Sequence, residues 1–257
     1  MLPFLKQHPF PVTAFFDYSL VFSFAIPKEE LENKIPQCLE LDTFEVVDDA
    51  NGNLKSYGFV AVAMVKTKEL RPKGFPKFMG NNFFLIGYRI FVNYINSEGK
   101  KLRGLYILKS ETDKFKMKML GSIFTQYNYS IIDILTQKTD TNLSISSNTT
   151  DFLAKVTFEE ETELPKHSPF KNWKEARRFA GPLPNTFTFN AKKNEVLIIK
   201  GKRQNWHPSP VNVVEYNIPF LETLNVKNYV LANAFVIENI PYEWEKGKID
   251  RWTQTKI

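Results

Sequence analysis

Residues 15–26 read FFDYSLVFSFAI, and this stretch decides the fold class. Aromatic and branched side chains dominate it, smaller or polar ones alternate with them, and Pro27 ends it. This composition favours a β-strand with one face packed against a core. Because similar segments recur along most of the chain, we predict an α+β fold that is mostly β, with a few short helices.

Two segments carry helix signals instead. Residues 27–35 begin with a proline and have acidic side chains in the first turn, and residues 172–179 are followed by Gly181 and Pro182. Between the strands, residues 71–77 are predicted to be irregular because of their prolines and glycine. The predicted strands share the alternating pattern and are residues 39–47, 57–65, 83–95, 102–108, 124–135, 143–146, 152–158, 186–189, 196–200, 211–218 and 229–237.

The chain offers no sign of a domain boundary. A hairpin turn is predicted at residues 49–53, but no linker rich in proline, glycine and serine interrupts the pattern. We therefore expect one domain over residues 1–257.

Composition limits the classes of function. The 257 residues are 43% hydrophobic and 24% charged, as in ordinary globular proteins, and the 23 phenylalanines could line a pocket as well as fill a core. The single cysteine, Cys38, forms no internal disulfide, and no targeting or membrane-spanning segment is visible, so we expect a cytoplasmic protein without a membrane partner. The net charge of +6 comes from scattered lysines, which argues against nucleic-acid binding. A homo-oligomer is left open.

Motifs for metals and nucleotides are absent. The histidines His8, His167 and His207 lie far apart, and none has a ligand neighbour at metal-binding spacing. The chain has no G-x-S-x-G elbow and no glycine-rich phosphate loop. We therefore predict no metal and no cofactor. His207, in a proline-rich loop, is either a pocket acid or base or a side chain that caps backbone groups.

Residues 114–121 read KFKMKMLG and place three lysines among large apolar side chains. An amine near other cations and apolar walls can lose its proton and attack a carbonyl carbon. If the stretch is helical, Lys114 and Lys118 share a face; if it is extended, all three lysines form a solvated face. The residues alone leave both alternatives open.

Four stretches together resemble the acetoacetate decarboxylase-like superfamily, including its uncharacterised bacterial branches. LENKIPQCLEL at residues 31–41 resembles an early helix, proline and strand of that family, and FVAVAM at 59–64 resembles the following strand. LRGLYIL at 102–108, leading into KMLG at 118–121, resembles the strand and loop that hold the Schiff-base lysine. Residues 173–184 resemble the uncharacterised branch in particular.

The resemblance implies an antiparallel, cone-shaped β-barrel with a hydrophobic pocket and a lyase-type reaction on a keto acid or related carbonyl compound. Lys118 falls at the imine-forming position and Glu69 near the active-site glutamate, while Lys116 or Lys114 would lower the amine's pKa. The sequence departs from the family at Met119, where a second lysine is expected.

Two further departures are Met117 in place of a proline and Asp17 in place of an arginine. The strands that should face the pocket suggest Phe83, Phe84 and Tyr106 as substrate contacts, together with His207. The alternative function is a non-catalytic barrel that binds an apolar or aromatic small ligand.

Overall fold

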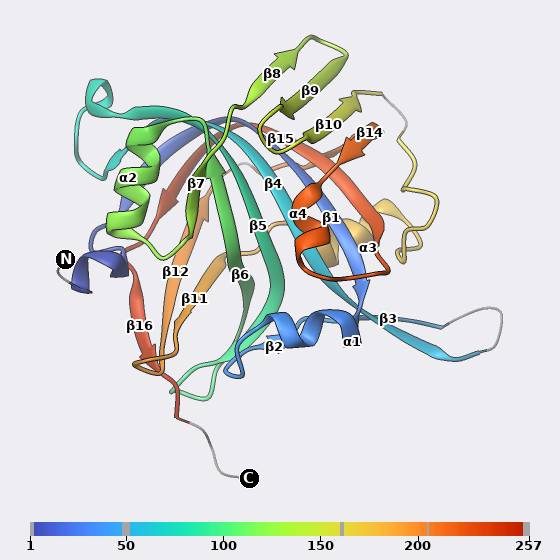
Figure 1. Cartoon of the computed structure of the whole chain (residues 1–257), viewed down its shortest axis with the longest axis horizontal. Coiled ribbons are helices and arrows are strands. Elements are labelled where there is room, and N and C mark those ends of the chain that lie inside the picture. Colours follow the sequence, from blue (N-terminus) through green and yellow to red (C-terminus); the bar gives the residue numbers. More distant parts are fainter. Residues whose placement is uncertain (1–2, 48–51, 160–161, 205, 254–257) are drawn as a thin grey trace.

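The computed structural model describes residues 3–47, 52–159, 162–204 and 206–253, and its main element is a sheet of twelve strands (Figure 1). Seven strands pair in the order β15-β1-β4-β5-β6-β11-β12, and β12 pairs again with β15, so hydrogen bonds close a ring. The cone-shaped barrel predicted from the sequence goes beyond this pairing and stays a prediction. The ring strands are β1 (Val12–Pro27), β4 (Leu54–Pro72), β5 (Asn81–Ile95), β6 (Lys101–Thr112), β11 (Asn185–Asn190), β12 (Glu195–Arg203) and β15 (Val230–Trp244).

The remaining strands of this sheet are short and attach to the ring strands. They are β2 (Glu40–Leu41), β3 (Phe44–Val47), β7 (Tyr129–Ile131), β13 (Ser209–Pro210) and β16 (Lys248–Arg251).

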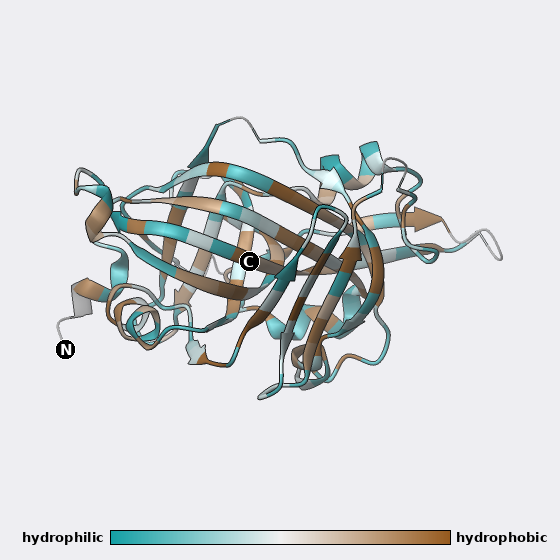
Figure 2. Ribbon diagram, turned by 90° about the horizontal axis from the view of Figure 1, so that it is seen from above, coloured by the Kyte–Doolittle hydropathy of each residue, from teal (hydrophilic) through white to brown (hydrophobic). Residues whose placement is uncertain are grey.

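Alternation along the ring strands separates two faces, and Figure 2 shows apolar and polar colours alternating along the ribbons. One face, the packed face, carries large side chains such as Leu20, Phe22 and Val62, all fully buried. The opposite face, the cavity face, carries smaller ones such as Ala61 and Ala63. This difference in side-chain volume leaves room on the cavity face.

A second, four-stranded sheet has the order β14-β10-β9-β8. Its strands contribute Leu143, Ile145 and Phe152 to the hydrophobic cluster of the packed face. The sheet therefore covers apolar surface that the ring alone would expose. Its strands are β8 (Leu135–Lys138), β9 (Asn142–Ser147), β10 (Phe152–Thr157) and β14 (Asn212–Asn217).

Helices are few and short. The helix predicted at residues 172–179 is confirmed as α3 (Trp173–Ala180), where the Asn172 side chain accepts a hydrogen bond from the Glu175 amide at 3.0 Å. The helix predicted at residues 27–35 is confirmed as α1 (Lys28–Leu31), which the 3₁₀ turn η2 (Glu32–Lys34) continues. The other helical elements of the described residues are η1 (Pro3–Gln7), η3 (Lys77–Met79), α2 (Phe115–Phe124) and α4 (Pro219–Thr223).

Several sequence-based expectations need correction. The strand predicted over residues 124–135 is wrong, because α2 runs to Phe124 and only β7 is extended before β8 begins. The strand predicted over 39–47 is divided into β2 and β3, and β4 continues to Pro72 within the segment expected to be irregular. Most of the turn predicted at residues 49–53 lies outside the described residues.

The sheet is not wholly antiparallel. β6 pairs in parallel with β11 and with β7, so the ring contains one parallel junction. A parallel pair requires a crossover connection, and the chain supplies one between β6 and β11 that includes α2, α3 and most of the second sheet. Within the described part of the chain, no helix combines the length and apolarity needed to cross a bilayer.

Candidate functional site

A cavity of about 380 Å³ lies on the cavity face of the ring. Its volume is within the range of small-molecule sites, roughly 300–1,000 Å³. Strands β1, β4, β5, β6 and β15 supply apolar walls, and small residues at the centre of β4 leave the space open. Representative wall residues are Val21, Ala61, Ala63, Leu85, Phe91 and Phe235.

Helix α2 forms another wall of the cavity. Met117, Leu120 and Gly121 line it, and the glycine matters because a Cβ at position 121 would lie 2.2 Å from the Tyr129 ring. The helix lies beside η1, and the His8 amide donates to the carbonyl of Phe124 at 2.9 Å (Figure 1). Residues 115–124 thus adopt the helical alternative considered for the lysine cluster.

The three lysines of this cluster lie away from the cavity lining. Lys118 is half-buried on the flank of α2, beside the wall residue Met117. Lys116 is exposed, and Lys114 is exposed and forms an ion pair with Asp113 at 3.5 Å. The catalytic roles assigned to Lys118 and Lys116 stay predictions.

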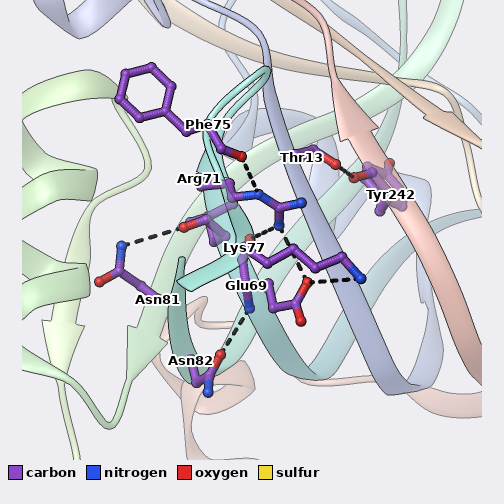
Figure 3. A network of polar contacts seen from close by, with 9 residues as sticks. Thr13, Glu69, Arg71, Phe75, Lys77, Asn81, Asn82 and Tyr242 are labelled. Carbon is purple, nitrogen blue, oxygen red and sulfur yellow. Dashed lines mark hydrogen bonds and ion pairs between the residues drawn. The ribbon is translucent and has the colours of Figure 1, made fainter. Parts of the chain in front are cut away.

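Glu69 occupies an irregular part of β4 where the pairing with β5 shifts register, and Figure 3 shows its polar contacts. Its φ is +55°, its amide donates to the Asn82 side chain at 2.9 Å, and its carboxylate lies 3.4 Å from Arg71 and 3.9 Å from Lys77. Gly80 allows this geometry, because a Cβ there would lie 2.5 Å from the Cα of Glu69. Glu69 is therefore connected to the cavity through Arg71, which lines it.

The predicted substrate contacts are divided between locations. Phe83 lines the cavity, whereas Phe84 and Tyr106 belong to the packed face. His207 lies in a separate depression of about 470 Å³, together with Lys138 and other residues. Asp17, one of the departures noted above, forms an ion pair with Lys68 at 2.7 Å. A role for Phe84, Tyr106 or His207 in binding substrate stays a prediction.

Among the described residues that line the cavity, the charged side chains are those of Arg71, Arg89 and Arg203. Arg71 donates to the carbonyl oxygens of Glu69 at 2.7 Å and Phe75 at 2.9 Å. Arg203 donates to the Pro182 carbonyl at 2.6 Å, and its guanidinium lies 4.1 Å from the centre of the Trp206 ring. These two cations are held by neighbouring groups.

Arg89 is different. It is half-buried on β5, and no hydrogen bond or ion pair joins its side chain to any other residue that the structure describes. Its Nε is buried without a partner. Its guanidinium lies over Gly87, because a Cβ at position 87 would meet Nη2 at 3.0 Å and Nε at 3.2 Å. The glycine leaves space for this group.

Two tyrosines lie near the Arg89 charge. Burial raises the pKa of Tyr127 to about 12 although the Arg89 charge acts to lower it, and burial also raises the pKa of Tyr129. Both phenols are therefore neutral at physiological pH. The Tyr127 hydroxyl lies 3.1 Å from the Thr186 hydroxyl, and the two rings are 6.3 Å apart. The two tyrosine rings therefore form part of the aromatic wall of the cavity, but as neutral groups they do not balance the positive charge of Arg89.

His8 is a further polar residue of the lining. It is buried, its Nδ1 has no hydrogen-bond partner among the described residues, and burial lowers its pKa. The ring is thus neutral at physiological pH. No group of three or more histidine, cysteine, aspartate or glutamate side chains in the described ranges is placed to hold a metal ion.

Sequence reasoning missed Arg89, although a signal was present. Positions 83, 85, 87, 89 and 91 share one face of the strand predicted over residues 83–95 and read Phe, Leu, Gly, Arg and Phe. A single arginine beside a glycine on an otherwise apolar face indicates a cation directed into an interior.

Solved structures share this fold. Acetoacetate decarboxylase from Legionella pneumophila matches with a TM-score of 0.59 and 11% identity, covering 94% of this chain and 88% of that one. An acetoacetate decarboxylase-like enzyme from Sphingomonas wittichii matches with a TM-score of 0.55 and 11% identity, covering 97% and 94%. The enduracididine biosynthesis enzyme MppR, complexed with pyruvate, matches with a TM-score of 0.50 and 8% identity, covering 95% and 89%.

These similarities confirm the predicted resemblance at the level of the fold. A comparison with curated proteins finds no match. The sequence model of one family, DUF2071, described as an uncharacterized conserved protein, matches residues 15–237. With most of its length covered by that match, the chain belongs to the DUF2071 family and has the fold of the acetoacetate decarboxylase-like enzymes.

Proposed function

We propose that the chain binds a small apolar or aromatic molecule in the cavity, within a ring that forms a cone-shaped barrel. The observation that carries this proposal is the cavity itself, which holds about 380 Å³ between walls that are mostly aliphatic and aromatic. Burial of apolar ligand surface against such walls supplies roughly 25 cal/mol per Å². Arg89, the tyrosines and His8 are polar groups available to orient the ligand.

Titration with a neutral aromatic probe, phenylbutanol, tests this function. Trp206 and Trp244 line the cavity, so their fluorescence should report saturable binding, with calorimetry as a second measurement. Ala63→Leu places extra methyl groups in the cavity and should weaken binding about tenfold or more.

Ala191→Leu is the matched control, because it makes the same change at an exposed turn and should leave binding unchanged. Absence of saturable phenylbutanol binding, or equal binding by the Ala63→Leu variant, would contradict the proposal.

Lyase-type chemistry through a lysine imine is the second candidate. It is favoured by the decarboxylase-like fold and by the position of Lys118 on the helix that forms a cavity wall. The neutral amine would attack a carbonyl carbon of a keto acid, water would leave, and a C=N bond would form. Loss of CO₂ would then place the electron pair of the broken C–C bond into the iminium.

In this scheme Glu69 handles protons or positions the substrate, and Lys116 or Lys114 helps to lower the pKa of the amine. The chemistry requires the Lys118 amine to enter the cavity from the flank of α2. Borohydride trapping with a panel of 2-keto and 3-keto acids tests it, read by intact mass and peptide mapping. An adduct on Lys118 that Lys118→Ala removes would support the imine, with Lys192→Ala, at an exposed turn, as the matched control. Absence of any lysine adduct on folded protein would exclude it.

A further inference from the structure

We propose that Arg89 is the anchor of an anion subsite, and that the natural ligand of the cavity is an amphipathic carboxylic acid with an apolar body. This inference rests on the proposed binding function and adds the chemical class of the ligand. It also names the residue that selects that class.

The first support is the missing counter-charge. A guanidinium remains protonated in proteins, and a half-buried cation such as Arg89 loses part of its hydration with no ion pair to replace it. No aspartate or glutamate lines the cavity among the described residues, and Arg89 makes no ion pair with any of them. The positive charge is therefore compensated when an anion enters.

The second support is the space prepared for the guanidinium. Ala63 on β4 pairs with Gly87 on β5, and Ala61 pairs with Arg89 itself, so small residues surround the cation. Because the Arg89 Nε has no hydrogen-bond partner, the guanidinium can donate two parallel N–H groups, one from Nε and one from Nη, to the two oxygens of a carboxylate. The planar, bidentate match favours a carboxylate.

The third support is the rest of the lining, which suits the remainder of such a ligand. Apolar walls and the rings of Tyr127 and Tyr129 surround the space beyond the cation, and both phenols are neutral at physiological pH. Neutral rings do not repel an anion, and their faces contact an aliphatic or aromatic chain. A single charged head on an apolar body matches this arrangement.

The experiment compares phenylbutanoate with phenylbutanamide and phenylbutanol, which share the body and differ in the charge of the head. Calorimetry on the full chain at neutral pH should show the acid binding about 10- to 100-fold more tightly than the amide, as for a hydrogen-bonded charge. Arg89→Met should remove this preference while amide and alcohol affinities stay within about threefold. Arg251→Met removes an exposed cation on β16 and should keep the preference.

Each other outcome is decisive. If phenylbutanol binds but the acid binds no more tightly than the amide, or if the preference survives in Arg89→Met, the anion subsite is wrong and the apolar site stands. If none of the three compounds binds, the proposed function and the subsite both fail. If inorganic phosphate binds more tightly than phenylbutanoate and Arg89→Met abolishes that binding, the ligand class is a phosphate and the carboxylate assignment is overturned.

Discussion

The Arg89 cation has no counter-charge among the described residues, and this has a consequence for stability. Arg89→Met removes that charge and keeps much of the apolar stem, so we expect the free energy of unfolding to rise by about 1 kcal/mol. Urea unfolding of the ligand-free protein measures it.

Arg71→Met is the matched comparison within the same cavity. It deletes donors to the Glu69 and Phe75 carbonyls, and the free energy of unfolding should fall by about 1 kcal/mol. Equal destabilisation by both substitutions would mean that Arg89 is held as firmly as Arg71, contrary to the structure.

The single thiol is a second residue with a measurable consequence. Cys38 is buried, and burial raises its pKa to about 12. Because the thiolate is the reactive form, iodoacetamide at about pH 8 should label native protein far more slowly than protein in urea. Mass spectrometry measures both rates. Rapid labelling of the native protein, at the unfolded rate, would show that Cys38 is accessible.

Among the elements, the parallel junction between β6 and β11 depends on a glycine. A Cβ at Gly104 would lie 2.5 Å from the Asn185 carbonyl oxygen and 2.5 Å from the Phe187 ring, so the backbone of β11 would have to move. We expect Gly104→Ala to lower the free energy of unfolding by about 2 kcal/mol or more. Denaturant unfolding with circular dichroism checks it.

Gly87→Ala provides the contrast at the same scale. Its new methyl group meets the far end of the long Arg89 side chain and not backbone, so the loss of stability should be clearly smaller. Similar losses for the two variants would mean that the junction tolerates movement.

The strands were largely predictable from the sequence, because the alternation of apolar and polar side chains every two residues is visible in a short stretch of chain. Helix α2 was left open for a physical reason: residues 114–119 alternate lysine with apolar residues, while Met117, Leu120 and Gly121 also share a helical face. The β6–β11 pairing joins segments about eighty residues apart, and no local pattern encodes it. The site could not be predicted for the same reason. Whether a given lysine, phenylalanine or arginine lines the cavity depends on how distant segments pack together, which no local pattern encodes.

For the whole molecule, the buried tyrosine hydroxyls and the buried thiol make stability depend on pH in the alkaline range. Burial raises the pKa of Tyr18, Tyr127 and Cys38 to about 12, from ordinary values of 10.0 for tyrosine and 9.0 for cysteine. The folded state thus binds these protons more tightly than the unfolded state. Their contribution is complete below about pH 9 and is lost as pH rises through about 12.

Urea midpoints measured from pH 7 to pH 11 should therefore fall above about pH 9. Tyr18→Phe is the test variant, because it removes a titrating hydroxyl and keeps the ring, and the fall should become shallower. An unchanged midpoint through pH 11 would contradict the assignment.

The closure of the ring has a consequence for how the chain is made. Val12 at the start of β1 pairs with Trp244 at the end of β15, so the first ring strand shares a ladder with the last. At about 5–20 residues per second, the ribosome would release these partners roughly ten to fifty seconds apart. During that interval one long edge of β1 has no mate, and a nascent chain with so apolar an edge is a natural client for chaperones.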